Sequence, residues 1–437
     1  MVVAVAPPFI LLEIYRKPIM TNRKLNRRGF LAVAATAAVA PMVVPGSVLG
    51  KDGGVAPNEQ INLALIGIGN RANDHIGSFC GNNNFRLTAV CDCYDAHAES
   101  GKVRVDNRYH NSDCKTYKMY EDILADPVYD AISIATPDHW HTKIAVEACK
   151  AGKDVFSEKP LTLTLAEGRQ IVKAARMYNR VCSSGSQRVM EDYGYMAPVI
   201  LSGAIGEVKE IHCGLGNPGR ECYLPEEPIP AGLDWDRWLG QAPWAQFNAE
   251  RMSGSYGGGW RNFSEYGNGF LADWGAHKFG GALYVCGMDH LVPEKVYQPH
   301  TEANPTDGVM MVLPNGVKVF HNRNGQHDVT IIGTEGEYRH NKSRNVIKPL
   351  HAVNCRRYHN GANNITEDFA YCVRNRLRPF QDFFYGAQTA ALCQIANIAY
   401  KVGRDLTYDA EKMVFVGDEM ATKMVSRVQR APYTIEI

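Results

Sequence analysis

The stretch that most constrains the fold is a strand–helix–strand pattern over residues Tyr129–Leu161. Its first apolar run ends at Thr136-Pro137, where proline stops a strand. Apolar residues then recur at helical spacing as far as Gly152, which ends the helix, and a second apolar run follows. Two strands joined by a helix lie parallel and are covered on both faces, so the pattern predicts a buried parallel sheet.

Polar residues follow both predicted strands of this unit. The first strand leads into Thr136–His141 and the second into Glu158–Pro160. In an open parallel sheet, ligands bind just beyond the carboxyl ends of the strands. We therefore expect both segments to lie on one functional edge, where Lys159 and the histidines His139 and His141 can take part in proton chemistry.

A glycine-rich turn earlier in the chain has the form of a dinucleotide-binding fingerprint. The apolar run Ile61–Ile66 is followed by Gly67-Ile68-Gly69-Asn70-Arg71-Ala72 and then by a helical pattern. The first glycine allows a tight turn, the second lets a pyrophosphate approach the backbone, and the small alanine permits close helix packing. The free N–H groups at the start of the helix would face the phosphates. The alternative is a glycine turn that binds no nucleotide.

A carboxylate follows the next predicted strand, Arg86–Val90. Asp92 stands there, roughly 20 residues beyond the glycines, which is the spacing of the acid that binds the adenosine ribose. A carboxylate at this place favours NAD over NADP, because the extra phosphate of NADP would meet a like charge. Arg71 would soften that preference.

The order of predicted elements divides the 437-residue chain into two folded parts. Strands and helices alternate through residues 57–186, which predicts a doubly wound α/β domain of the Rossmann type that binds NAD. Residues 187–437 predict an α+β domain for substrate binding and oligomerisation, with a large, mostly antiparallel sheet and a late helix at Ala410–Gly417. The net charge of +1 argues against a nucleic-acid partner held by a strong basic field.

Residues 1–56 are predicted to be an export signal and a linker. The twin arginines of Arg27-Arg28-Gly29-Phe30-Leu31 precede the small-residue apolar run Ala32–Val44, a pattern that resembles a Tat signal. The run is shorter than the roughly 20 residues that span a bilayer. We expect a protein that is periplasmic or otherwise exported, and the alternative is that the signal is retained as an anchor.

The spacing of cysteines and histidines predicts no metal site. None of it matches a closed zinc site, although the sequence has 12 cysteines. Five cysteines fall in apolar runs and are expected to be buried small hydrophobes: Cys91, Cys149, Cys182, Cys213 and Cys393.

Four motifs stand together in this chain. They are the turn Thr136-Pro137-Asp138-His139-Trp140-His141, the strand entry Ala151-Gly152-Lys153-Asp154-Val155, the ending Glu158-Lys159-Pro160, and an element that runs from Gly269 through Asp273 to His277. In combination they resemble the Gfo/Idh/MocA oxidoreductase family, from about Asn62 to the C-terminus. The resemblance implies a carbohydrate substrate and a homo-oligomer that pairs through the sheet of the second domain.

The resemblance also implies where the chemistry takes place. Lys159 would lie beside the nicotinamide and the reacting carbon, while Asp273 and His277 relay the proton. Hydride transfer from a sugar carbon needs a base for the hydroxyl proton and a positive group for the developing oxyanion. Asp273 and His277 are four residues apart and share one helix face, but this spacing leaves open which of them is the first base. The structural alternative is that Asp273 only caps a helix and His277 is a core histidine.

The other candidate residues are assigned to the cofactor or to the substrate. Glu158 would bind a ribose or only pair with Lys159, and Arg188 would line the pocket or form an ion pair between domains. The residues predicted to bind the cofactor are Gly67, Gly69, Asn70, Arg71, Asp92, Thr136, Pro137, His139, His141, Glu158 and Lys159. Those predicted to bind the substrate are Gln187, Arg188, Trp260 and Arg261.

These assignments favour an NAD-dependent dehydrogenase or reductase acting on a sugar, cyclitol or glycoside. The alternative is a glycoside hydrolase or lyase that oxidises its substrate transiently and recycles tightly held NAD. Export favours this alternative because free NAD is scarce outside the cytoplasm, but the Thr-His-x-x-Gly-Pro pattern associated with such glycosidases is absent around His277. A binding protein without catalysis is a third alternative, against which the intact Lys159, Asp273 and His277 argue.

Overall fold

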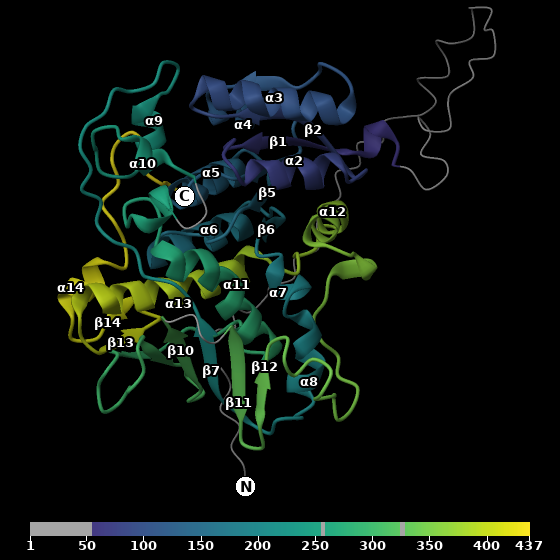
Figure 1. Cartoon of the computed structure of the whole chain (residues 1–437). Coiled ribbons are helices and arrows are strands. Elements are labelled where there is room, and N and C mark those ends of the chain that lie inside the picture. The colour runs from purple at the N-terminus through teal and green to yellow at the C-terminus, as the bar shows by residue number, and fades with distance from the viewer. Residues whose placement is uncertain (1–54, 255–257, 324–327) are drawn as a thin grey trace, which may run out of the picture.

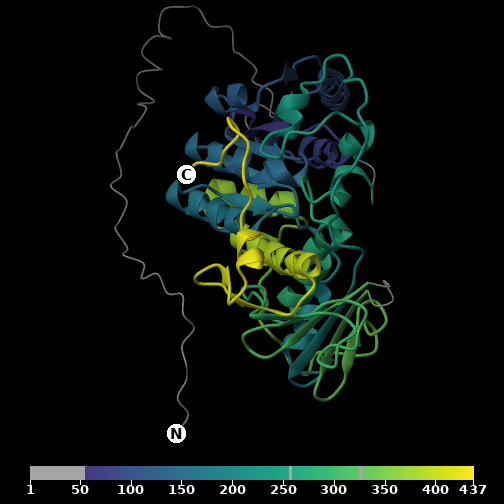
Figure 2. The same ribbon diagram turned by 90° about the vertical axis from the view of Figure 1, so that its left-hand side faces the viewer.

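The computed structural model describes residues 55–437, apart from 255–257 and 324–327. All but the last two residues of the predicted signal and linker, 1–56, lie outside this part. The described chain forms two domains that stack on one another (Figure 1, Figure 2). Among the described residues, no helix is both long enough and apolar enough to cross a membrane.

The first domain is a six-stranded sheet with helices on both faces, and it confirms the predicted doubly wound fold (Figure 1). All its neighbouring strands pair in parallel, in the order β3-β2-β1-β4-β5-β6. The order reverses where β4 lies beside β1, and ligands bind at the carboxyl ends of strands at such a reversal. The strands are β1 (Ile61–Ile66), β2 (Phe85–Cys91), β3 (Lys115–Tyr117), β4 (Ala131–Ile134), β5 (Asp154–Ser157) and β6 (Cys182–Ser184). The helices are α2 (Ala72–Cys80), α3 (Asp95–Tyr109), α4 (Tyr120–Ala125), α5 (Asp138–Lys150) and α6 (Leu165–Met177).

The central unit β4–α5–β5 has the predicted form. Helix α5 begins directly after Pro137, whose fixed φ suits the start of a helix, and the chain leaves it through Gly152 at a φ of +80°. Eleven of the thirteen residues of α5 are buried, because the helix lies among the sheet, α6 and parts of the second domain. Because the helix is buried on nearly all sides, the burial of its residues does not show which of them face a ligand.

The second domain is an eight-stranded sheet in the order β12-β11-β7-β10-β9-β8-β13-β14. Helices α11 (Gly269–Val285) and α13 (Phe383–Val402) lie between this sheet and the first domain (Figure 1). The sheet is mostly antiparallel as predicted, but it is mixed, because β7 and β10 pair in parallel. The strands are β7 (Val208–Gly214), β8 (Lys295–Tyr297), β9 (Met310–Val312), β10 (Lys318–Asn322), β11 (Val329–Gly333), β12 (Glu337–Arg339), β13 (Leu406–Asp409) and β14 (Val414–Phe415).

The helix predicted at Ala410–Gly417 is wrong. The segment instead completes a hairpin in which β13 pairs antiparallel with β14. Met413 adopts a φ of +56° and Gly417 a φ of +73°, and positive φ values interrupt a helix. The remaining helices are α7 (Arg188–Glu191), α8 (Ala197–Leu201), α9 (Trp235–Leu239), α10 (Ala249–Met252), α12 (Ile365–Asn375), α14 (Glu419–Lys423) and the 3₁₀ helix η5 (Gly259–Asn262).

The two domains are joined by packing and by polar contacts. Helix α13 packs against both α6 and α11, and apolar residues of both domains share one continuous core. The C-terminal tail returns to the first domain, where Arg427 donates to the carboxylate of Glu167 at 2.8 Å and to the carbonyl of His139 at 3.0 Å. All twelve cysteines are free, and the five that were expected to be buried are buried.

Candidate active site

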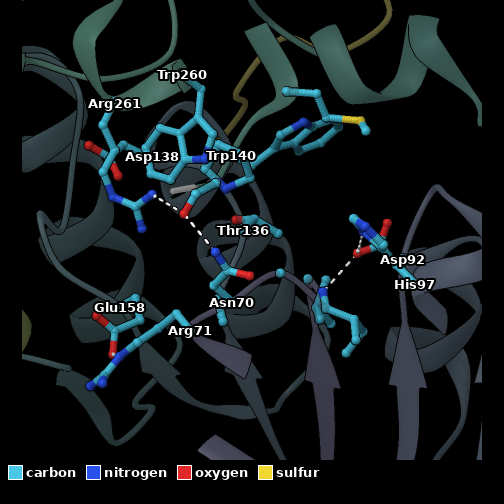
Figure 3. A pocket seen from close by; sticks show the side chains of 18 of the residues that line it. Asn70, Arg71, Asp92, His97, Thr136, Asp138, Trp140, Glu158, Trp260 and Arg261 are labelled. Atoms are coloured by element: carbon cyan, nitrogen blue, oxygen red, sulfur yellow. Dashed lines mark hydrogen bonds and ion pairs between the residues drawn. The ribbon is translucent and has the colours of Figure 1, made fainter. Parts of the chain in front are cut away.

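A cavity of about 740 Å³ opens where the carboxyl ends of β1, β4 and β5 face the second domain (Figure 3). This volume is within the range of small-molecule and cofactor sites. Both domains contribute to the lining, which includes Gly67, Thr136 and Pro137 from the first and Trp260 and Asp273 from the second.

The glycine turn has the geometry that a dinucleotide requires. Gly67 has a φ of +89°, and a Cβ there would stand 2.6 Å from the backbone nitrogen of Thr136. Both the conformation and the close approach therefore require glycine. A Cβ at Gly69 would meet no atom of the described residues within 4 Å, so this side of the turn leaves the pocket open for a pyrophosphate. The residues present thus fit NAD.

Asp92 is fixed beside this turn by two backbone amides. Its Oδ2 accepts from the N–H of Ile68 at 2.7 Å and its Oδ1 accepts from the N–H of Tyr94 at 2.9 Å. A carboxylate has about four acceptor sites, so each oxygen can still accept a ribose hydroxyl. The placement agrees with the predicted ribose-binding role.

Asn70 and Arg71 both line the pocket, but both side chains already form hydrogen bonds with other groups of the protein. The side-chain amide of Asn70 donates to the carbonyl of Gly254 at 3.0 Å and so connects the glycine turn to the second domain. Arg71 donates to Glu158 at 2.7 Å and to Asp74 at 2.6 Å. Arg71 therefore has two acidic partners at the edge of the site.

The carboxylate of Glu158 is held from the protein side. Its Oε1 accepts from Arg71 at 2.7 Å and lies 2.9 Å from the Nε2 of His75, while its Oε2 accepts from the backbone N–H of Lys159 at 3.2 Å. Burial alone would raise the pKa of Glu158, but the Arg71 charge and the His75 hydrogen bond hold it well below its usual value. Of the two predicted roles, the structure favours ion pairing, and Arg71 rather than Lys159 is the main partner.

Lys159 and Asp273 meet across the two domains. The Nζ of Lys159 donates to the Oδ1 of Asp273 at 2.6 Å and to its backbone carbonyl at 2.9 Å. The Nε of Arg261 lies 3.6 Å from the same Oδ1. Both side chains of the Lys159–Asp273 pair are largely buried, at 14% and 8% exposure, so this ion pair is held in a site of low dielectric. The sequence-predicted pair is therefore brought together.

His277 lies one turn beyond Asp273 on α11, and it also lines the pocket. Burial, together with the nearby charge of Lys159, lowers its pKa well below the ordinary value, so the imidazole is neutral at pH 7. Its Nδ1 is buried and has no hydrogen-bond partner among the residues that the structure describes. A neutral ring of this kind is suited to exchange a proton with a substrate hydroxyl.

The two histidines of the turn, His139 and His141, are absent from the pocket lining, which corrects their assignment to the cofactor. The Nε2 of His139 lies 3.0 Å from the carbonyl of Trp238. The ring nitrogens of His141 lie 2.9 Å from the carbonyl of Pro160 and 3.0 Å from that of Thr136. Burial lowers the pKa of both rings, that of His139 to about 3. Both side chains are thus used to fasten segments together.

The predicted substrate residues line the same pocket as the Lys159–Asp273 pair. The guanidinium of Arg261 stacks over Trp260 at 4.3 Å. Arg188 pairs with Asp192 at 2.6 Å and lies over the ring of Trp274 at 5.2 Å. Gln187, at the start of α7, also lines the pocket. Arg188 therefore does not form the ion pair between domains that was the alternative expectation.

A segment of the second domain, whose tryptophans were expected either to stack on sugar rings or to belong to the core, covers the nucleotide end of the pocket. We call residues 217–254 the cover segment. Its Asp234 N–H donates to the carbonyl of Cys93 at 2.9 Å, and Arg237 pairs with Glu121 at 3.0 Å. The pocket-lining residues of this segment are Arg237, Trp238, Ala249, Met252, Ser253 and Gly254. Its irregular, proline-rich sequence carries no periodic signal that could have placed it there.

Asp138 is a second residue that sequence reasoning passed over. It belongs to the turn that identified the family, it is only 4% exposed, and it lines the pocket. The available signal was an acid directly after the proline that ends the strand, at the first position of the helix.

Comparison with known proteins agrees with both domains. A family model described as "Oxidoreductase family, NAD-binding Rossmann fold" matches residues 61–186. A second model, described as "Oxidoreductase family, C-terminal alpha/beta domain", matches residues 213–435. Both are models of the Gfo/Idh/MocA family, and the second alone covers about half of the chain.

Individual relatives and solved structures are more distant. A "Glycosyl hydrolase family 109 protein" of Shewanella baltica is 30% identical over 212 residues, or 42% of this chain and 44% of the relative. The chain therefore matches less than half the length of this curated relative. The WlbA dehydrogenase from Bordetella pertussis, in complex with NADH and UDP-GlcNAcA, is 18% identical with a TM-score of 0.55, covering 80% of this chain and 99% of that one. An aldose-aldose oxidoreductase from Caulobacter crescentus is 16% identical with a TM-score of 0.53, covering 80% and 99%. At these sequence identities, the likeness to the two structures establishes the fold of this chain and nothing further.

Proposed function

We propose that this chain, which belongs to the Gfo/Idh/MocA oxidoreductase family and has its NAD-binding Rossmann domain, transfers a hydride between nicotinamide and a hydroxyl-bearing carbon of a sugar, cyclitol or glycoside. The observation that carries the proposal is the ion pair of Lys159 and Asp273, 2.6 Å apart, with a neutral His277 one helical turn away. A cation and a proton acceptor at one edge are what oxidation of a carbinol needs.

The residues divide the work between binding and chemistry. Gly67 and Gly69 would receive the pyrophosphate of NAD, and Asp92 would accept the ribose hydroxyls. The bound nicotinamide supplies the hydride exchange. Lys159 donates a hydrogen bond to the substrate oxygen and stabilises its negative charge, with Asp273 holding the ammonium group in place. His277 takes the hydroxyl proton, because it is neutral and its Nδ1 has no partner among the described residues.

A screen of sugars, cyclitols and glycosides tests this function on protein whose bound nucleotide has first been identified. The proposal predicts that at least one compound changes the nicotinamide absorbance. A protein that binds NAD but exchanges no hydride with any compound would instead support the third alternative, a binding protein without catalysis.

A second candidate is glycoside cleavage through transient oxidation, with NAD recycled in each turnover. It is favoured by the cover segment, which contacts Cys93 and Glu121 in the nucleotide domain and would slow the escape of a bound cofactor. The curated relatives named as glycosyl hydrolases support it as well. Release of an aglycone without net formation of NADH would establish this candidate, while NADH accumulating in proportion to product would exclude it.

The proposal also includes export and self-association. The twin arginine at Arg27-Arg28 supports export through the Tat system. Fusion of residues 1–56 to a reporter should direct it out of the cytoplasm, and replacing both arginines with lysine should abolish this. We expect a homo-oligomer, which light scattering would distinguish from a monomer.

A further inference from the structure

Asp138 is the first residue of α5 and projects at the wall of the pocket near Trp260 and Arg261 (Figure 3). It is 4% exposed. The largest influences on its carboxyl are burial and neighbouring charges rather than hydrogen bonds. Hydride transfer as described above gives it no task.

Charged groups from three elements surround this carboxyl. Asp273 approaches from α11, Arg261 from η5, and Lys159 and Glu158 from the end of β5. Burial disfavours the charged form most strongly and the Asp273 charge adds to this, while Arg261 and Lys159 oppose both. The net result raises the pKa of Asp138 to about 8. At neutral pH this residue therefore carries a proton inside the pocket, as catalytic acids with raised pKa values do in other enzymes.

Cleavage of a glycoside needs such a proton. An alkoxide is a poor leaving group, and a positioned acid contributes roughly 10²–10⁴-fold to a step that expels one. The Lys159–Asp273–His277 group is already engaged at the hydroxyl that is oxidised. A separate acid on the same pocket wall can reach a different oxygen of the same sugar.

We propose that Asp138 is the general acid that protonates the glycosidic oxygen as the aglycone leaves. This inference rests on the second candidate function, glycoside cleavage with recycled NAD. The structure thereby assigns two sets of groups to two oxygens of one substrate: Lys159, Asp273 and His277 to the hydroxyl that becomes a ketone, and Asp138 to the leaving group.

The protons and electrons balance over a turnover. Oxidation of a ring hydroxyl to a ketone acidifies the neighbouring C–H bond. Loss of that proton to a base forms a C=C bond, the glycosidic C–O bond breaks, and its electron pair stays on the leaving oxygen, which takes the proton of Asp138. Water then adds to the double bond: its oxygen bonds to the anomeric carbon, one of its protons returns to Asp138, and the ring carbon recovers a proton from the base. Return of the hydride to the ketone carbon, and of the hydroxyl proton from His277 to its oxygen, completes the cycle without net oxidation.

The test compares two leaving groups in the Asp138→Asn variant. A nitrophenyl glycoside needs no protonation, because its leaving group is already a stable anion, whereas an alkyl glycoside does need it. We expect cleavage of the alkyl glycoside to fall about 100-fold or more and that of the nitrophenyl glycoside to change only a few-fold. Reduction of the bound nicotinamide should be unchanged. An equal loss on both glycosides, or loss of nicotinamide reduction, would overturn the role of Asp138.

An infrared titration of the free protein gives a readout that does not depend on activity. Wild type should have a protonated-carboxyl band at pH 7 that disappears around pH 8 and is absent from Asp138→Asn. Lack of this difference would overturn the inference. If wild-type protein reduces its nicotinamide but releases no aglycone, glycoside cleavage itself fails and the role of Asp138 fails with it, a result distinct from failure of the variant comparison alone.

Discussion

The two ends of the pocket are built in different ways. At the nucleotide end, backbone geometry dominates: Gly67 turns the chain at positive φ, and two amides fix Asp92. At the chemical end, a buried ion pair joins Lys159 of one domain to Asp273 of the other. One short stretch of sequence determines the first, whereas the second exists only when the domains pack. Substitutions at the nucleotide end should therefore alter cofactor affinity, and those at the chemical end should alter the rate.

The largest effect is expected from Asp273→Asn. This change leaves the Lys159 ammonium without its carboxylate in a largely buried site, so we expect hydride transfer to slow by about 10²–10⁴-fold. Unfolding should become easier by about 3 kcal/mol, because one partner of a buried pair has been removed. Single-turnover kinetics and denaturant unfolding measure the two effects.

Asp122→Asn is the matched control, because Asp122 is exposed on α4. It should change neither quantity measurably. If Asp273→Asn instead weakened NAD binding and left the rate intact, the proposed division between the two ends would be wrong.

Two alanine substitutions separate the roles of Gly67 and Gly69 in the glycine turn. Gly67→Ala places a methyl group 2.6 Å from the Thr136 nitrogen at a φ of +89°, and should cost about 1–3 kcal/mol of stability as well as NAD affinity. In Gly69→Ala the added methyl group meets no atom of the described part of the chain within 4 Å, so the change should leave stability as it is and weaken NAD binding alone. Thermal unfolding without NAD, followed by calorimetric titration with NAD, separates the two. Equal losses of stability in both variants would contradict the idea that Gly69 faces the cofactor.

A smaller effect is expected at Asp92. Replacement by Asn keeps an acceptor for the amide of Ile68 but removes the charge that receives ribose hydroxyls. NAD affinity should fall about tenfold, because hydrogen bonds to a charged group are worth roughly 1.5–3 kcal/mol and part of that is retained. NADP should lose less than NAD, since its phosphate no longer meets a carboxylate. An unchanged affinity for NAD would exclude the ribose assignment.

The smallest effect on activity is expected at His139, which stands beside Asp138 in the chain but outside the pocket lining. Burial lowers the pKa of His139 in the folded state to about 3 from 6.5. Between these two pH values the unfolded chain therefore binds a proton at His139 that the native state does not bind. The contribution of the neutral His139 ring to the free energy of unfolding is therefore complete above about pH 6.5. It is lost as the pH falls, by up to about 1.4 kcal/mol per pH unit.

His139→Gln should reduce that pH dependence and leave turnover within about twofold of wild type, since the ring binds the Trp238 carbonyl rather than a ligand. Urea unfolding at several pH values between about 6.5 and 4 measures the slope. A strong loss of turnover at unchanged stability would restore His139 to the cofactor site.

The nucleotide end could be predicted from sequence because its physical causes are local. It is defined by a strand, two glycines at fixed spacing and an acid after the next strand. The predicted ends of these strands agree with the structure to within a residue or two. The chemical end required a family pattern to connect Lys159 with Asp273, which are 114 residues apart. Neither spacing nor periodicity could have placed these two side chains in contact.

Other features depend on long-range packing that a pattern does not record. Helix α5 is buried on almost every side, so its sequence could not distinguish Asp138, which lines the pocket, from His139 and His141, which do not. The parallel pairing of β7 with β10 joins strands that are far apart in the chain. The cover segment has no periodicity, and its position depends on contacts such as that of Arg237 with Glu121.

The most direct test of the central claim is stopped-flow measurement of nicotinamide absorbance after NAD-loaded protein is mixed with a panel of sugars and glycosides. Wild type, Lys159→Ala and the surface control Lys150→Ala would be compared at equal NAD occupancy. The proposed function predicts substrate-dependent reduction in wild type and Lys150→Ala, and a rate at least about 100-fold lower in Lys159→Ala. Reduction as fast in Lys159→Ala as in wild type, or no reduction by any compound, would contradict it.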